Sequence, residues 1–161
     1  MYMIHPFSMN GKIKKFTIKI YVFLHIYFLT QKNKIFMSKK IIHTEKAPQA
    51  VGPYSQAVEA NGMLFISGQI PVDPSTGKMP EGITAQTEQV MKNIGAILKE
   101  AGYTYEHVIK STCLLTDMAD FKAMNEVYAK YYPNNPPARA AFAVKGLPLN
   151  AMVEIETIAT K

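Results

Sequence analysis

Residues 57–69 read Ala57-Val58-Glu59-Ala60-Asn61-Gly62-Met63-Leu64-Phe65-Ile66-Ser67-Gly68-Gln69, and this stretch decides the architecture of the chain. Its central pair, Asn61-Gly62, is the strongest short hairpin signal that a sequence offers. Asn and Gly accept the positive φ angles that a two-residue turn between antiparallel strands requires. We therefore predict two antiparallel strands around this turn, over residues 54–60 and 63–69.

Two helices are expected beyond the hairpin, after a loop over residues 70–82 that is rich in proline and glycine. The first helix starts at Ile83 and is ended by Gly102. Its apolar residues recur at helical spacing, at Val90, Ile94, Ile97, Leu98 and Ala101. The second helix can be capped by Asp117 or Asp120 and stops before Pro133. Its apolar face carries Phe121, Met124, Val127, Tyr128 and Tyr131.

Four further strands are predicted over residues 41–43, 107–115, 138–144 and 151–160, the last two joined through Gly146-Leu147-Pro148. The order of elements favours an α+β fold, with both helices on one face of a mixed sheet. The other face of the sheet still carries apolar residues. Since large exposed apolar faces mark interfaces, we expect a closed homo-oligomer.

The first 36 residues differ from the remainder in charge. They contain six lysines and no acidic residue, whereas residues 37–161 carry equal numbers of basic and acidic residues. The leader's apolar run, residues 20–29, is too short for a membrane helix, which needs about 20 residues. We interpret residues 1–36 as a gene-model extension or a disordered arm, with Met37 as the natural start. A targeting peptide and an ordered extension are the alternatives.

Residues 37–161 have the length of one compact domain. The single cysteine of the chain, Cys113, cannot form an intrachain disulfide and is consistent with a reducing compartment. It lies in an apolar run and is expected to be a buried structural thiol. We expect a cytoplasmic protein, or a mitochondrial one if the leader is a genuine targeting peptide.

Several kinds of chemistry have no motif in this sequence. It contains no glycine-rich phosphate loop, no Gly-x-Ser-x-Gly elbow and no Cys-x-x-Cys pair. His43 and His107 have no ligand partner at helical or strand spacing, and His5 and His25 lie in the leader. We therefore expect no metal, no cofactor and no serine–histidine triad.

Three charged residues near the C-terminus suggest a site. Arg139 is the only arginine beside seventeen lysines, and it stands in a small apolar strand where a charge needs a reason. Glu154 and Glu156 share one face of the last strand. If the two strands are antiparallel neighbours, these side chains approach within about 5 Å. The alternatives are a chance residue in a lysine-biased chain and a solvated strand edge.

Residues 38–161 resemble the RidA/YjgF imine deaminases, a family formerly labelled endoribonuclease L-PSP. The similarity is carried by five stretches in a specific order, namely Gly52-Pro53-Tyr54-Ser55-Gln56-Ala57, Ser67-Gly68-Gln69-Ile70-Pro71, Pro137-Ala138-Arg139, Leu147-Pro148 and Glu154-Ile155-Glu156-Thr157-Ile158-Ala159. The resemblance implies a chorismate-mutase-like (YjgF-like) α+β fold. It also implies a homotrimer with a central barrel and three clefts between subunits.

The resemblance also implies roles for individual residues. Arg139 would bind a substrate carboxylate, and Glu154 would orient or activate the attacking water. The cleft would further be lined by Tyr54, Ser67, Gly68, Asn125 and Ala141. Some bacterial members have cysteine at the position of Ala141, so we expect that position to contribute its backbone.

The implied reaction is hydrolysis of reactive enamine or imine intermediates, such as 2-aminoacrylate, to 2-keto acids and ammonia. Small 2-imino and 2-keto acids would be the ligands. A ribonuclease is the first rival hypothesis, but the neutral charge of residues 37–161 argues against a nucleic-acid partner. A non-catalytic ligand-binding module is the second, and the presence of both Arg139 and Glu154 argues against it. We expect no membrane partner.

Overall fold

The Asn61-Gly62 hairpin forms as predicted in the computed structural model, which describes residues 39–161. Asn61 and Gly62 have φ angles of 52° and 73°. Strand β2 (Ala57–Ala60) pairs antiparallel with β3 (Met63–Gln69) across this turn. Strand β2 begins three residues later than predicted. The chain before it is a loop, in which the Gln56 carbonyl accepts a bond of 3.0 Å from the Ser67 amide.

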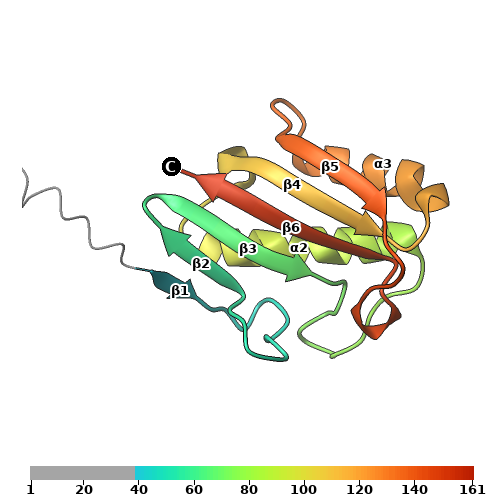
Figure 1. Cartoon of the computed structure of the whole chain (residues 1–161), viewed down its shortest axis with the longest axis horizontal. Coiled ribbons are helices and arrows are strands. Elements are labelled where there is room, and N and C mark those ends of the chain that lie inside the picture. Colours follow the sequence, from blue (N-terminus) through green and yellow to red (C-terminus); the bar gives the residue numbers. More distant parts are fainter. Residues whose placement is uncertain (1–38) are drawn as a thin grey trace, which may run out of the picture. The chain divides into compact units, whose positions relative to one another are not determined.

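The remaining strands are β1 (Lys40–Ile42), β4 (Val108–Leu115), β5 (Ala138–Ala143) and β6 (Val153–Thr160). They form one six-stranded sheet in the order β1-β2-β3-β6-β4-β5 (Figure 1). Only the β4–β5 pair is parallel among the described strands. The predicted mixed sheet is confirmed.

The expectation that the strands of Arg139 and Glu154 are neighbours is wrong. Strand β6 lies between β3 and β4, and β5 pairs with β4 on the far side. The reason is the helix α3 between β4 and β5, because a strand–helix–strand crossover returns the chain parallel to the strand it left. A short link between two strands does not by itself make them neighbours.

Both helices lie on one face of the sheet, as predicted (Figure 1). Helix α2 (Ile83–Glu100) buries four of the five predicted apolar residues, and the fifth, Ala101, is buried directly after the helix. Gly102 follows with φ 77°. The Gly102 amide donates to the Lys99 carbonyl at 3.0 Å, and the Tyr103 amide donates to the Leu98 carbonyl at 2.7 Å. This pair of bonds is a Schellman motif, which explains why glycine ends the helix here.

The second predicted helix is preceded by an extra turn. Asp117 caps a short 3₁₀ helix, η2 (Met118–Asp120), through a bond of 2.8 Å from the Ala119 amide. Helix α3 (Phe121–Tyr131) follows directly, and Asp120 makes no side-chain capping bond to it. Two further 3₁₀ helices, η1 (Tyr105–His107) and η3 (Pro148–Asn150), precede β4 and β6. They explain why both strands start later than predicted.

The sheet face opposite the helices carries a row of apolar side chains. Ile41, Val58, Phe65 and Ile158 are successive cross-strand partners on β1, β2, β3 and β6. Phe65 is 43% exposed, and Phe142 on the edge strand is 49% exposed. The predicted apolar open face is therefore present, and burying it would favour association.

The predictions for residues 1–36 lie outside the described residues. Within residues 39–161, no helix is long and apolar enough to cross a membrane. Cys113 is buried, as predicted, and it lies on the helix side of the sheet.

Candidate active site

Glu154 lies at the start of β6 and is packed against a glycine. Its register partner on β4 is Leu114, and it belongs to the open face of the sheet. On the neighbouring strand β3, the pairing is irregular between Ile66 and Gln69, and Gly68 lies in this irregular segment. A Cβ atom at Gly68 would stand 1.8 Å from Glu154 Oε1 and 2.8 Å from its Cδ. The carboxylate thus occupies space that only a glycine leaves open.

The Glu154 carboxyl is perturbed by this position. Partial burial raises its pKa above the ordinary value, and the negative charge of Glu156, two residues along the same face, raises it further. A carboxylate with a raised pKa is a better proton acceptor at neutral pH than an ordinary one. Glu154 is therefore suited to general base catalysis.

Four of the predicted site residues line one cavity. Tyr54, Ser67, Gly68 and Glu154 surround a space of about 770 Å³ between the 45–56 loop, the end of β3 and the start of β6. The Ser67 hydroxyl donates to the Ser55 carbonyl at 2.7 Å, so its lone pairs can still accept. The volume suits a small organic molecule.

A buried glutamine holds the loop that forms one wall of this cavity. The Gln56 side chain accepts from the Thr44 amide at 2.7 Å and donates to the Pro48 carbonyl at 2.8 Å. Gln56 is only 2% exposed, and it also donates to the carbonyls of Thr44 and Ala47. Gln56 belongs to one of the stretches that carry the family resemblance, but no role was predicted for it. The sequence feature that could have indicated its buried role is a polar side chain within a predicted strand.

Two buried polar residues of α2 support the opposite wall. The Asn93 amide donates to the carbonyls of Ile70 and Val72, at 3.1 and 2.9 Å. The Gln86 side chain accepts from the Met152 amide at 2.8 Å, two residues before Glu154. The helix periodicity singled out the apolar residues of α2 and missed both of these.

The rim of the cavity includes a strained residue. Leu149 has φ 55° and is 68% exposed, and Asn150 has φ 61°. A left-handed conformation is uncommon for leucine and costs roughly 1–2 kcal/mol. Such residues cluster at functional sites, and Leu149 lines the cavity beside Pro148.

The other predicted site residues lie on the opposite side of the sheet. Arg139 is the register partner of Ser111, which in turn pairs with Thr157. Ser111 and Thr157 are buried beneath the helices, so Arg139 belongs to the helix face. Glu154 belongs to the open face. Arg139 and Glu154 therefore cannot meet within one copy of the chain.

Ala141 and Asn125 lie on the side of Arg139. Ala141 pairs with Cys113 and follows Arg139 by two residues on β5, so it shares the helix face. Asn125 is on α3, and its Oδ1 atom is buried without a hydrogen-bond partner. The predicted site is thus divided into two groups, one around Glu154 and one around Arg139.

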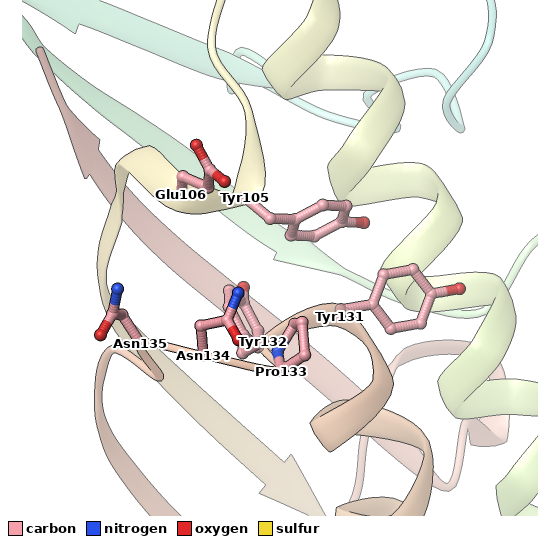
Figure 2. Close-up of a pocket in the computed structure, with 7 residues that line it drawn as sticks. All are labelled: Tyr105, Glu106, Tyr131, Tyr132, Pro133, Asn134 and Asn135. Carbon is pink, nitrogen blue, oxygen red and sulfur yellow. The ribbon is translucent and has the colours of Figure 1, made fainter.

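A second cavity, of about 370 Å³, lies between η1 and the end of α3 (Figure 2). The Tyr105 ring lies 5.1 Å from Tyr131 and 5.5 Å from Tyr132, so the rings pack on one another. The Tyr131 hydroxyl donates to Glu88 Oε1 at 2.6 Å, and that of Tyr105 donates to the Met91 carbonyl. This tyrosine cluster joins α2 to α3 and is best understood as packing.

Residues 39–161 contain no group of three or more His, Cys, Asp or Glu side chains placed to hold a metal ion. The described residues thus place a candidate general base, Glu154, in a largely apolar cavity, within an α+β fold whose open sheet face is apolar. Comparison with known proteins finds a matching family. The family model for "Endoribonuclease L-PSP" matches residues 44–161.

Named relatives are similar over nearly all of the described chain. Reactive Intermediate Deaminase A, chloroplastic, of Arabidopsis thaliana is 54% identical over 125 residues, which are 77% of this chain and 67% of that protein. The mouse 2-iminobutanoate/2-iminopropanoate deaminase is 48% identical over 124 residues, 76% of this chain and 92% of that protein. A crystal structure of Escherichia coli TdcF with bound serine superimposes with a TM-score of 0.74 at 41% identity. The superposition covers 76% of this chain and 98% of the TdcF chain. The chain belongs to the RidA/YjgF/L-PSP family, and the YjgF-like fold is confirmed.

Proposed function

We propose that this protein is a reactive-intermediate deaminase, which hydrolyses enamine and imine intermediates to 2-keto acids and ammonia. The observation that carries this proposal is the Glu154 carboxylate, held against Gly68 in a cavity and shifted toward a stronger base. Relatives at 48–54% identity are named as deaminases of this kind. 2-Aminoacrylate and its imine tautomer, 2-iminopropanoate, are the simplest such substrates.

The chemistry needs one positioned water and one proton acceptor. Glu154 accepts a proton from the water as its oxygen forms a bond to the carbon of the protonated imine. The resulting carbinolamine has hydroxyl and amino groups on the same carbon. Return of the proton from Glu154 to nitrogen lets ammonia leave as the C–N bond breaks. The carbonyl of the 2-keto acid forms as Glu154 takes up the proton of the hydroxyl group, which then passes to ammonia or solvent and restores the carboxylate. Holding the substrate beside Glu154 turns a chance encounter with water into a directed attack.

Arg139 is proposed to bind the substrate carboxylate through its planar fork of N–H donors. Because Arg139 and Glu154 lie on opposite faces of the sheet, this role requires that the two residues come from neighbouring copies of the chain. The exposed apolar open face supports such an assembly, and the family resemblance implies that it is a homotrimer. Asn125 and Ala141 would then enter the cleft with Arg139. Tyr54, Ser67 and Gly68 would enter it with Glu154 of the next copy.

The rival ribonuclease function receives no specific support from the described residues beyond the family's older name. A polyanion-binding site normally uses several clustered cations, and this cavity is lined by two acidic residues, Glu45 and Glu154, and by no lysine or arginine. A small carboxylate ligand fits the site better than a nucleic acid.

The proposed compartment remains the cytoplasm, with an organelle as the alternative. The Arabidopsis relative is chloroplastic by name, so a targeting role for residues 1–36 has a precedent among similar proteins. Fluorescent fusions of the full chain and of a chain starting at Met37 would distinguish the two. Different distributions of the two fusions would identify residues 1–36 as a targeting signal.

The function is tested by generating 2-aminoacrylate in situ and following pyruvate formation above the spontaneous rate. Wild-type protein should accelerate pyruvate release, and Glu154→Gln should reduce that acceleration by about 10²–10⁴, because glutamine cannot accept the proton. Glu156→Gln, two residues away on the same strand face, is the matched control and should be far milder. Equal losses in both variants would contradict the role of Glu154, and no acceleration by wild type would contradict the function.

A further inference from the structure

Two aromatic rings of α3 lie against the guanidinium of Arg139. Its Cζ atom is 4.7 Å from the centre of the Tyr128 ring and 5.7 Å from that of Phe121. Phe121 and Tyr128 are seven residues apart on α3, which is two helical turns, so they share one face of the helix. Helix α3 packs behind the edge strand β5, which carries Arg139 (Figure 1).

These contacts leave the hydrogen-bonding edge of the guanidinium unused. The side chain of Arg139 makes no hydrogen bond and no ion pair within residues 39–161, where the one ion pair joins Lys40 to Glu59. A ring contacts a guanidinium through its flat face, whereas the N–H donors point outward in its plane. Stacking therefore fixes the plane and keeps the donors available to a carboxylate.

Tyr128 is itself held firmly in place. It is 5% exposed, and its ring lies 4.7 Å from that of Tyr132. Its hydroxyl is buried near Ser111, the register partner of Arg139, but makes no directional hydrogen bond. The ring of Tyr128, rather than its hydroxyl, is thus the part that contacts the arginine.

We propose that Tyr128, assisted by Phe121, is a positioning residue that orients the guanidinium of Arg139 for binding the substrate carboxylate. The inference rests on the proposed function, since it assigns Arg139 the carboxylate. If an Asp or Glu side chain positioned the guanidinium instead of Tyr128, its carboxylate would occupy the N–H donors that the substrate needs. An aromatic support avoids that competition.

Removing the ring should weaken substrate binding more than turnover, because the carboxylate contact exists in both ground and transition states. Tyr128→Leu is expected to raise KM about 5- to 30-fold, the range for loss of a largely desolvated cation–π contact. The value of kcat should fall much less. Tyr128→Phe keeps the ring and should restore KM to within about twofold of wild type.

The experiment measures kcat and KM for 2-aminoacrylate hydrolysis and, separately, the Kd of 2-oxobutanoate, a 2-keto acid that requires no turnover. Tyr131→Leu is the matched control, since it removes a tyrosine ring from the same helix that does not contact Arg139. If Tyr128→Leu does not fold, Phe121→Leu tests the same contact at a less buried ring and should raise both KM and Kd about 2- to 5-fold.

The outcomes separate this proposal from the function on which it rests. A rise in KM and Kd for Tyr128→Leu, with Tyr128→Phe near wild type, supports the proposal that the Tyr128 ring positions Arg139. Values for Tyr128→Leu and Phe121→Leu equal to wild type, with normal wild-type turnover, overturn it alone. A wild-type protein that binds 2-oxobutanoate but hydrolyses no imine overturns the proposed function instead. If Arg139→Ala also binds 2-oxobutanoate as tightly as wild type, Arg139 does not hold the carboxylate, and the positioning role of Tyr128 is overturned as well.

Discussion

Replacing Gly68 by alanine adds a single methyl group at the point where β3 touches the Glu154 carboxylate. The added Cβ would lie 1.8 Å from Oε1, whereas ordinary van der Waals contact begins at 3.4 Å. The carboxylate must therefore retreat by about 1.6 Å. Gly68 does not have a positive φ angle, so alanine meets no backbone penalty there.

The size of this shift predicts a selective loss of activity. A misplacement of about 1 Å in a catalytic group can cost about 10²-fold in rate, so kcat/KM should fall by at least about two decades. Stability should change by about 1 kcal/mol or less, because the atom that moves is the free end of a side chain and not backbone. The displaced carboxylate would also be better hydrated, which would bring its pKa back toward the ordinary value.

The assay compares imine hydrolysis and thermal unfolding of Gly68→Ala with those of Gly146→Ala. Gly146 also lacks a positive φ angle, and a Cβ there meets nothing within 4 Å, so this variant controls for the substitution itself. Wild-type activity in Gly68→Ala would refute the claim that the position of Glu154 matters. A collapse in melting temperature would refute the claim that the side chain simply moves aside.

Two further predictions concern individual side chains, and a third concerns the leader. Burial is the larger cause of the raised pKa of Glu154, and Glu156→Gln removes the smaller one, the neighbouring negative charge. The acid limb of the kcat/KM profile should therefore move to lower pH, and an unchanged limb would mean that another group titrates. Tyr131→Phe removes the hydrogen bond to Glu88 and should lower the free energy of unfolding in urea by about 1 kcal/mol, with activity retained. An unchanged free energy of unfolding would show that hydrogen bonds to water in the unfolded chain are equally favourable. A chain starting at Met37 should keep oligomeric state, melting temperature and activity, and a large loss of any of these would give the leader a structural role.

Local structure was the most predictable part of this chain. The Asn61-Gly62 turn, the apolar face of α2 and the Gly102 cap each depend on residues close together in sequence, and all three are confirmed. The family resemblance also implied Tyr54, Ser67, Gly68 and Glu154 as site residues, and the structure brings these four to one cavity.

The neighbour relations between distant strands were not predictable in the same way. Alternating apolar residues define the face that a strand buries, but they do not say which strand lies beside it. Arg139 and Glu154 were expected on adjacent strands, whereas β4 separates their strands and the two residues face opposite sides. The supporting residues were missed for a related reason. Gln56 acts through bonds to residues 8–12 positions away, which no periodicity records.

The central claim is that imine hydrolysis occurs in a cleft to which one copy of the chain gives Arg139 and the next gives Glu154. Arg139→Ala and Glu154→Gln proteins should each release little pyruvate from 2-aminoacrylate supplied near the wild-type KM, and their refolded mixture should be assayed under the same conditions. If the protein forms the proposed closed trimers, random assortment restores both residues in roughly one quarter of the clefts, so activity should recover to about a quarter of wild type. A mixture as inactive as its components, in trimers shown by mass to contain both variants, would contradict the shared site.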